Sequence, residues 1–374
     1  MHILHISTDF GGSKVHVSLY KNLAEQGVAQ TIYCPVRSVR EIGQNAFVAK
    51  ETDIVYDNVI KPYHRYVYHI KRQAIFRSLQ NKINVNNVDL CHAATLFTDG
   101  GQAYKIYKKY HIPYVVAVRN TDINGFLDLL PHTWSAGKAI LRHAEKIFFI
   151  SDALMEKFMN HRVIQPTLDE IRDKMVLIPN GIDEFYLNHL CHEPHFGHRV
   201  LYVGDFSNNK NVLRLGEAVL RLRAELGYED VTLTLVGGGK NTDDRVQQMI
   251  YGHPDVFQYL GPIYDKEKLS EVFRAHSLFA MPSIHETFGL VYIEALSQNI
   301  PVIYTKGQGI DRLFNDSVGI GVNPLSVDDI TQAMKTILST PDNYNNTSID
   351  FDVFNWNSIA KKYMGYYSEI INSK

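Results

Sequence analysis

The amino-acid sequence predicts two successive α/β domains, each built on a parallel sheet covered by helices. Short apolar runs alternate with amphipathic stretches from residue 2 to residue 178, and the same alternation restarts at Arg199. The 374 residues also exceed the usual domain size of about 100–200 residues. A polar, His-rich stretch, His189–His198, separates the two halves. We therefore predict domains over residues 1–192 and 193–356.

The first half opens with a strand, a glycine turn and a helix. His2–Ser7 is the apolar strand, Gly11 and Gly12 form the turn, and Lys14–Gln26 carries apolar residues at helical spacing. Later apolar runs that we predict as strands are Ala29–Cys34, Asp89–His92, Pro113–Val118, Lys146–Ile150 and Met175–Ile178.

The second half repeats this order. A strand reaching Gly204 precedes an amphipathic helix that begins at Asn211. The further predicted strands are Val231–Val236, Leu278–Met281 and Pro301–Tyr304. A last helix, residues 357–372, follows a polar linker, and we expect it to return and pack on the first domain.

Composition limits the function classes. The 38 Lys and Arg residues nearly balance the 40 Asp and Glu residues, which argues against a nucleic-acid partner. Three cysteines without metal-ligand spacing predict reduced thiols. His189, His192, His195 and His198 could hold zinc, but a polar loop between domains is the preferred interpretation. No apolar run reaches the roughly 18 residues of a membrane span, so we expect a cytoplasmic protein, with peripheral membrane contact left open.

The stretch SIHETFGLVYIEALS, residues 283–297, contains the residues most suggestive of a binding site. It follows a predicted strand, and ligands of open α/β sheets bind at the carboxyl ends of strands. A helix starting at Phe288 would direct free N–H groups at an anion such as a diphosphate. Glu294 lies within an apolar run, where a carboxylate needs hydrogen-bond donors such as a ribose diol. The alternative is that Glu286 and Glu294 are solvated charges.

This stretch resembles the glutamate-x7-glutamate signature of the retaining, family-4 glycosyltransferases of GT-B fold. Five further stretches resemble that family in the same order: residues 11–27, 178–183, 202–211, 235–239 and 259–263. The resemblance implies two Rossmann-like domains that face each other across a cleft. It also implies that the first domain binds the acceptor and the second binds a nucleotide-diphosphate sugar.

The resemblance assigns roles to individual residues. Glu294 would bind ribose, Glu286 would meet the donor sugar, and Lys210 would neutralise the leaving diphosphate. The remaining implied substrate-binding residues are Gly11 and Gly12 at the cleft, Ile263 near the base, and the backbone of Phe288, Gly289 and Leu290 at the phosphates. Since a fixed cation and aligned N–H groups can stabilise the leaving group, no metal or other cofactor is expected.

Two positions depart from the family pattern. Asp205 follows Gly204 where the family commonly has arginine, so we expect its carboxylate to point away from the diphosphate. Arg119 and Asn120 stand where the family often has histidine after a strand. Arg119 could clamp a phosphate or an anionic sugar, so we expect Arg119 to act in catalysis and Asn120 to bind substrate. The alternatives are that Arg119 pairs with Asp122, or that Arg312 supplies the additional cation.

A basic and aromatic segment lies in the first half. No acidic residue occurs between Asp57 and Asp89, and residues 61–82 hold Lys61, Arg65, Lys71, Arg72, Arg77 and Lys82 with Tyr63, Tyr66, Tyr68 and Phe76 between them. This segment could contact anionic lipid or a lipid-diphosphate acceptor. A solvated helical face is the alternative, and the balanced charge disfavours single-stranded nucleic acid.

We therefore expect a retaining, metal-independent hexosyltransferase of glycan or polysaccharide biosynthesis. It would move a hexose or N-acetylhexosamine from a nucleotide-diphosphate sugar, with UDP favoured over GDP, to a hydroxyl of a glycan or lipid-linked sugar. A nucleotide-sugar epimerase of the same architecture and a binding subunit without turnover are the alternatives.

Overall fold

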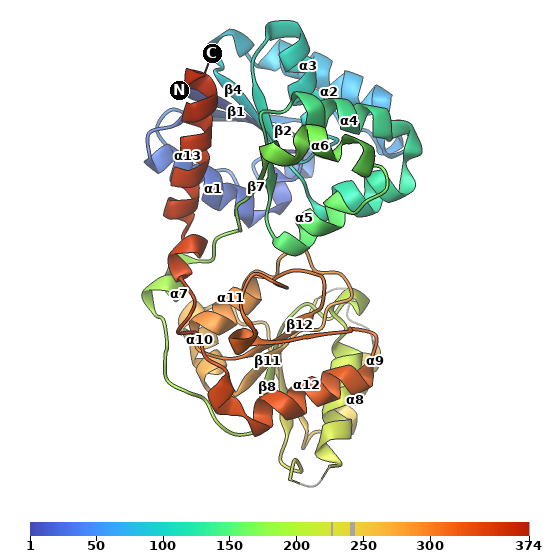
Figure 1. Cartoon of the computed structure of the whole chain (residues 1–374), viewed down its shortest axis with the longest axis vertical. Helices are drawn as coiled ribbons and strands as arrows, with labels where there is room; N and C mark the ends of the chain where they lie inside the picture. Colours follow the sequence, from blue (N-terminus) through green and yellow to red (C-terminus); the bar gives the residue numbers. More distant parts are fainter. Residues whose placement is uncertain (226, 240–243, 374) are drawn as a thin grey trace. The chain divides into compact units, whose positions relative to one another are not determined.

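The computed structural model describes residues 1–225, 227–239 and 244–373. The chain divides into two α/β units, and each is built on one sheet whose strand pairs are all parallel (Figure 1). The first unit holds residues 1–150 and 154–181 and the segment from Trp356 onward, and the second holds residues 151–153 and 182–355. The predicted fold class is confirmed. Within the described residues, no helix has the length and apolar character needed to cross a bilayer.

The first unit has a seven-stranded sheet of Rossmann-like order. In sheet order the strands are β3 (Thr52–Asp57), β2 (Ala29–Pro35), β1 (His2–Ile6), β4 (Leu90–Ala93), β5 (Tyr114–Ala117), β6 (Lys146–Phe149) and β7 (Met175–Leu177). The α-helices are α1 (Lys14–Glu25), α2 (Tyr68–Lys82), α3 (Gly100–Tyr110), α4 (Trp134–His143), α5 (Asp152–Met159), α6 (Leu168–Ile171) and α13 (Trp356–Asn372). The central strands are buried on both faces, which explains why they read as continuous apolar runs.

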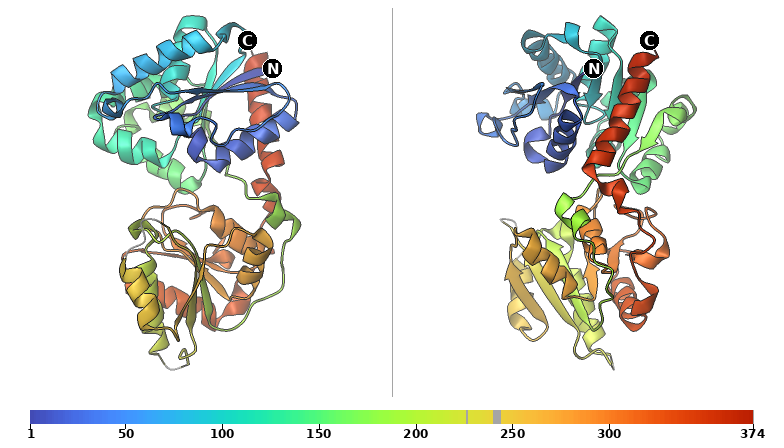
Figure 2. Two further views of the ribbon diagram at one scale, coloured as in Figure 1. Left: turned by 180° about the vertical axis from the view of Figure 1, so that it is seen from behind. Right: turned by 90° about the vertical axis from the view of Figure 1, so that its left-hand side faces the viewer.

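The C-terminal helix α13 belongs to this first unit. It packs along α1, as both views in Figure 2 show. Ile359, Tyr363 and Tyr367 of α13 lie in the same core as Ile3 and Leu23. The helix therefore completes a core that residues 1–181 alone would leave open.

The second unit has a six-stranded sheet. In sheet order its strands are β10 (Phe257–Gly261), β9 (Thr232–Gly237), β8 (Arg199–Gly204), β11 (Leu278–Ala280), β12 (Val302–Thr305) and β13 (Gly319–Val322). Its α-helices are α7 (Glu184–Asn188), α8 (Val212–Arg223), α9 (Asp244–Gly252), α10 (Lys266–Arg274), α11 (Leu290–Ser297) and α12 (Val327–Ser339).

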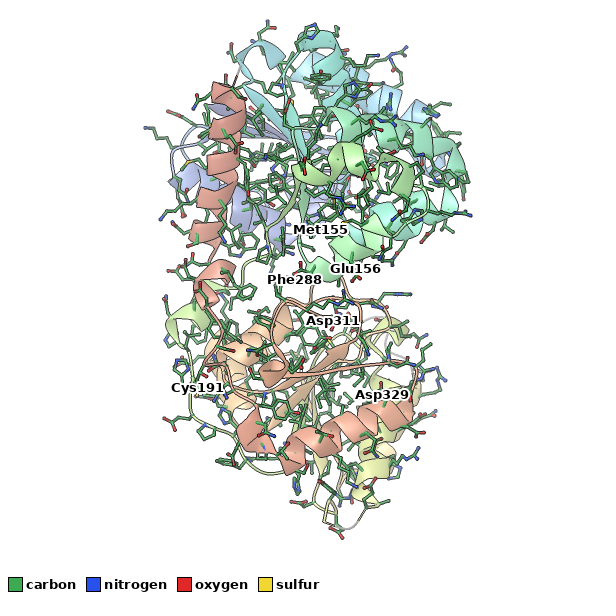
Figure 3. All side chains as sticks on the ribbon, in the orientation of Figure 1. Met155, Glu156, Cys191, Phe288, Asp311 and Asp329 are labelled. Atoms are coloured by element: carbon green, nitrogen blue, oxygen red, sulfur yellow. The ribbon has the colours of Figure 1, made fainter. Side chains whose placement is uncertain are left out.

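The division between the units lies at Gly181 and Ile182, earlier than the expected boundary after residue 192. The reason is that the chain packs on the second unit from α7 onward. The Cys191 N–H donates to the Ser297 carbonyl at 2.9 Å, and the Asn299 amide donates to the His192 carbonyl at 2.9 Å. Cys191 accordingly lies at the side of the second unit in Figure 3.

The four regularly spaced histidines have separate partners. His189 bonds the Phe185 carbonyl, His192 bonds Asn346, His195 bonds the Gln298 carbonyl and His198 bonds Asp230. Their side chains thus anchor the segment at four points instead of converging on one. Among the described residues no cluster of His, Cys, Asp or Glu is arranged to hold a metal ion.

Three strands are absent from the sequence prediction: β3, β10 and β13. All three are edge strands of their sheets. β3 and β10 are partly exposed, and β13 is the short, glycine-containing run GIGV. Edge strands of this kind lack the continuous apolar signal of central strands, so their sequence pattern is weak.

Candidate functional site

Two loops of the second unit meet at the carboxyl edge of its sheet. One follows β8 and contains the short 3₁₀ helix Asn208–Lys210, and the other runs from β11 to α11. β8 and β11 are neighbours in the sheet, so the loops that follow them start side by side. In sheets of this type that edge is where ligands bind.

Asn209 joins these two loops through three hydrogen bonds. Its carbonyl accepts from the Ile284 N–H at 2.7 Å, its side-chain oxygen accepts from the His285 N–H at 3.0 Å, and its amide donates to the His285 carbonyl at 2.9 Å. Asn211 has a left-handed φ of 62° and donates to the Pro282 carbonyl at 2.9 Å. Lys210, between these two asparagines, is therefore held in place from both sides.

Lys210 and Glu286 are brought together as an ion pair. The distance from Lys210 Nζ to Glu286 Oε2 is 2.7 Å, and the side chains are 20% and 11% exposed. The Glu286 backbone N–H donates to Gln308 Oε1 at 2.8 Å, which fixes the loop. A cation and a carboxylate thus stand together, partly shielded from water, at the ligand-binding edge.

The turn before α11 requires a glycine. Gly289 has a φ of 79°, and a Cβ there would lie 2.4 Å from ring atoms of Tyr292. The helix begins at Leu290, so Phe288 and Gly289 precede it instead of opening it as expected. The first N–H groups of an α-helix have no intrahelical acceptor, so this turn leaves donors available beside Glu286. Figure 3 shows Phe288 in this loop and Asp311 in the neighbouring loop after β12.

Glu294 lies one turn further along α11 in a different environment. The pKa of its carboxyl group is raised to about 7, mainly by burial and also by the nearby charge of Asp183, while the charge of Lys266 opposes the shift. No hydrogen bond to its carboxylate is found among the described residues. Glu294 therefore presents acceptors that a ligand hydroxyl could satisfy.

Asp183 and Lys266 were not identified as site residues from the sequence. They form an ion pair with each other beside Glu294. Asp183 caps α7 by accepting from the Phe185 N–H at 3.0 Å, and an aspartate before a helix is a signal that could have been used. Lys266 starts α10, after the loop that contains Ile263. The sequence carries no comparable signal for Lys266.

Asp205 does not face this site as a free carboxylate. Its Oδ1 accepts from the Ser207 N–H at 2.9 Å, and its carbonyl accepts from the Tyr202 hydroxyl at 2.5 Å. Asp205 therefore closes the turn after β8, where its side chain supports the loop that carries Lys210.

The remaining predicted site residues belong to the first unit. Gly11 and Gly12 form a 3₁₀ turn after β1 and line a cavity of about 400 Å³. A Cβ on Gly12 would meet no atom within 4 Å, so protein packing does not require a glycine there. The space in front of Gly12 is available to a ligand that approaches the backbone.

Arg119 and Asn120 follow β5 in the first unit. The Arg119 N–H donates to Asp122 at 2.9 Å, and its Nε donates to the Ala94 carbonyl at 3.2 Å. Arg119 thus contacts Asp122 through its backbone, and the alternative of a pair between the Arg119 side chain and Asp122 stays a prediction. Burial lowers the pKa of His16 to about 3, with the Arg119 charge as the second cause, so the guanidinium lies near α1. Arg312, the other candidate cation, lies in the second unit.

Residues 61–82 do not form one continuous basic and aromatic surface. Tyr68 and Phe76 are buried, and Lys82 pairs with Asp57 at 2.9 Å. The Lys71 ammonium turns inward and donates to the Thr98 hydroxyl at 3.1 Å. The exposed side chains of this segment include Lys61, Tyr63, Tyr66, Ile70 and Arg77. The side chain of Arg65 lies outside the described part of the structure.

Comparison with known proteins matches each half of the chain to a glycosyltransferase family model. The family model described as "Glycosyltransferase Family 4" matches residues 10–184, and that described as "Glycosyl transferases group 1" matches residues 197–340. The glycogen synthase of Mycobacterium tuberculosis strain H37Rv is 25% identical over 242 residues, which are 62% of this chain and 56% of that protein. The matched part of the chain spans 60%, 69% and 56% of the length of three curated relatives.

Solved structures show the same fold over the whole chain. Sucrose-phosphate synthase from Thermosynechococcus elongatus has a TM-score of 0.73 at 18% identity and covers 100% of both chains. Anabaena Alr3699/HepE in complex with UDP and glucose has a TM-score of 0.63 at 16% identity, and covers 100% of this chain and 99% of its own. At these identities the structures establish the fold alone. With both family models in chain order on this fold, the chain belongs to glycosyltransferase family 4 and has the GT-B fold.

Proposed function

We propose that the chain is a retaining glycosyltransferase that moves a hexose or N-acetylhexosamine from a nucleotide-diphosphate sugar to a sugar hydroxyl. The observation that carries this proposal is the Lys210–Glu286 pair, 2.7 Å apart, beside the turn that starts α11. A diphosphate placed there would accept from the ammonium and from the helix N–H groups. Glu286 would then be released to accept hydrogen bonds from the donor sugar.

This arrangement supports the departure of the diphosphate. When the bond from the sugar C1 to the phosphate oxygen breaks, negative charge builds on the leaving group, and Lys210 and the N–H groups of α11 offset it. In the retaining reaction that we propose, the acceptor oxygen bonds to C1 from the same face. The acceptor proton passes to the donor phosphate oxygen, so the chain supplies no nucleophile and requires no metal.

The donor nucleotide binds, in this proposal, along α11 and the loop before α10. The ribose hydroxyls donate to Glu294, and the base lies near the backbone of Ile263. We favour UDP over GDP, and the structural similarity to Alr3699/HepE, solved with UDP and glucose, supports this choice. The similarity to a glycogen synthase supports a role in glycan or polysaccharide synthesis.

The test is release of nucleotide by purified protein. UDP-glucose, UDP-N-acetylglucosamine and GDP-mannose are each incubated with a panel of sugar acceptors, and free UDP or GDP is measured. Glu286→Gln and Lys210→Ala should each lower the rate by about 10²–10³-fold. Lys361→Ala, an exposed lysine on α13, is the control and should keep the wild-type rate.

The same assay separates the alternatives. A new sugar nucleotide formed from the donor without any acceptor would identify an epimerase. UDP binding in calorimetry with no turnover across the acceptor panel would identify a binding subunit. Either result would overturn the proposed transfer reaction.

We place this reaction in the cytoplasm, with contact to a membrane through the exposed side chains of residues 61–82. Tyr63, Tyr66 and Ile70 are 56%, 74% and 55% exposed, and Lys61 and Arg77 add positive charge. Sedimentation with phosphatidylglycerol vesicles should retain the protein, and Tyr66→Ser with Ile70→Ser should reduce its retention. Equal retention on neutral phosphatidylcholine vesicles would contradict an electrostatic contribution.

A further inference from the structure

The first unit contains a second, larger cavity of about 470 Å³ at the carboxyl edge of its sheet. Thr8 and Asp9 after β1, Arg37 after β2 and Thr95 after β4 line it. Its other wall is apolar and includes Tyr68 and Phe126. The volume lies within the range of about 300–1,000 Å³ typical of small-molecule sites.

Two cationic side chains converge on this cavity. Lys71 and Arg37 both line it, and the Lys71 ammonium is held toward Thr98 by the 3.1 Å hydrogen bond. Burial lowers the pKa of Lys71, the nearby charge of Asp99 opposes this shift, and the charge of Arg37 lowers the pKa, so the two cations lie close enough to repel each other. Lys71 is partly buried and Arg37 is exposed. Two like charges this close are unfavourable unless an anion joins them.

The acidic groups around the cavity already have donors. Asp99 accepts from the Thr8 N–H at 3.2 Å and from the Thr95 hydroxyl at 2.9 Å, and burial raises its pKa to about 7. Asp122 accepts from the N–H groups of Leu96, Phe97 and Arg119, and burial raises its pKa to about 6. Asp9 is the exposed carboxylate that lines the cavity. Asp99 and Asp9 offset part of the charge on Lys71. Within the described residues, however, no ion pair joins Lys71 or Arg37 to a carboxylate.

A buried donor without an acceptor also lines the cavity. His64 is 2% exposed, and its Nδ1 accepts from the Lys61 N–H at 3.1 Å, so the ring proton lies on Nε2. Within the described residues, His64 Nε2 has no hydrogen-bond partner. A buried donor left unpaired is costly, and a bound acceptor atom would remove that cost.

We propose that this cavity binds a phosphate group of the acceptor, held by Lys71, Arg37 and the Nε2–H of His64. The acceptor is then a phosphorylated sugar or a sugar carried on a lipid diphosphate, and a neutral free sugar is a poor substrate. The inference rests on the proposed transferase function, because it names the acceptor class for that reaction. Tyr68 and Phe126 supply an apolar face for the ring or chain beside the phosphate.

The test measures binding by calorimetry with glucose 6-phosphate and glucose as probes. Saturating UDP is present throughout, so that the proposed diphosphate site of the second unit is occupied. Wild-type protein should bind glucose 6-phosphate at least about tenfold more tightly than glucose, as expected for hydrogen bonds to a charged group. Lys71→Gln and Arg37→Gln should each weaken that binding about tenfold or more. Lys361→Gln, at an exposed position of α13 in the same unit, is the matched control and should bind like wild type.

A second pair of probes identifies the source of the phosphate. Tighter binding of farnesyl diphosphate than of inorganic pyrophosphate, reversed by Phe126→Ser, supports a lipid-linked acceptor. Tighter binding of glucose 6-phosphate than of farnesyl diphosphate supports a soluble sugar phosphate. In both outcomes, Lys71→Gln must weaken binding of the phosphate-bearing probe.

The inference is overturned if glucose binds as well as glucose 6-phosphate, or if Lys71→Gln and Arg37→Gln bind like wild type while their melting temperatures are unchanged. Failure of the proposed function looks different. If the protein binds glucose 6-phosphate through Lys71 but releases no nucleotide from any sugar nucleotide, the cavity assignment holds and the transferase proposal is wrong.

Discussion

At the residue scale, the position of the Lys210–Glu286 pair is set by backbone contacts on both sides. Asn209 and Asn211 fix the loop after β8, which carries Lys210. Gln308 fixes the loop after β11, which carries Glu286. Because both side chains are mostly shielded, removing one partner leaves the other poorly compensated. Glu286→Gln keeps the size and one hydrogen-bonding oxygen, so it is the better variant for separating chemistry from stability.

Gly289→Ala should destabilise the second unit. The left-handed φ of 79° and the contact of 2.4 Å with the Tyr292 ring both oppose a side chain there. We expect a loss of about 1–3 kcal/mol in the free energy of unfolding, measured by urea denaturation. Gly365→Ala in α13, where a Cβ meets nothing within 4 Å, is the control and should be neutral or stabilising by up to about 1 kcal/mol. Equal effects of the two substitutions would contradict this account.

Binding of UDP should depend on the protonation of Glu294. Its pKa of about 7 lies above the ordinary value of 4.5, so protonation converts an acceptor-only carboxylate into a carboxylic acid as the pH falls through 7. In calorimetry the affinity for UDP should therefore decline between pH 8 and pH 6. Glu294→Gln should bind more weakly at pH 8 and show a flatter profile. A wild-type profile that matches the variant would exclude Glu294 as the ribose acceptor.

At the scale of elements, β4 and α13 are joined by a buried polar contact. His92 of β4 lies 2.6 Å, through Nδ1, from the Tyr367 hydroxyl of α13. Burial lowers the pKa of His92 to about 3, and the charge of Arg119 adds to this shift. The contact therefore requires a neutral imidazole at any pH near neutrality.

Acidification should weaken the first unit through His92. The unfolded chain takes up a proton at this histidine below pH 6.5 and the folded chain does so only near pH 3, so stability from this group is lost as the pH falls through that interval. Between pH 7 and pH 5 the expected loss is about 2 kcal/mol. Asp99 and Asp122, with raised pKa values, act in the opposite direction, so the test compares variants.

His92→Phe should remove this sensitivity. In urea denaturation its loss of stability from pH 7 to pH 5 should be about 2 kcal/mol smaller than that of wild type. Tyr367→Phe removes the same hydrogen bond but keeps the histidine, so it should retain the wild-type dependence on pH. Identical pH dependence in all three proteins would refute the role of His92.

At the scale of the whole molecule, each unit has its own sheet and its own buried core. The first core includes α13 from the far end of the chain, so the N-terminal segment and the C-terminal helix fold as one body. The proposed donor site, with Lys210, Glu286 and Glu294, lies within the second unit.

Calorimetric melting should show two transitions, and UDP should raise the midpoint temperature of one of them. A ligand bound to one folded unit stabilises that unit by about 2.7 kcal/mol at 100 times its dissociation constant. Gly289→Ala should lower the midpoint temperature of the transition that responds to UDP. His92→Phe at pH 7 should change the midpoint temperature of the other transition. A single transition that UDP and both substitutions shift together would show that the units unfold as one.

Much of this organisation could be read from the sequence because it depends on local patterns. The buried central strands are continuous apolar runs, and the strand–loop–helix order around Glu286 and Glu294 is visible in residues 278–297. The edge strands β3, β10 and β13 could not be predicted, since a partly exposed strand has little apolar signal. The domain boundary was misplaced because polarity alone does not show that the segment after Ile182 packs on the second unit.

The sequence by itself determined the two α/β halves, the family resemblance and the residue types of the proposed donor site, because periodicity and short motifs are local properties. Only the tertiary structure decided which distant side chains meet. It placed Asp183 and Lys266 beside Glu294, Asn209 against His285, and Lys71 with Arg37 and His64 around one cavity. These contacts join residues from separate loops, and their partners are set by strand order and helix packing, which no local pattern encodes.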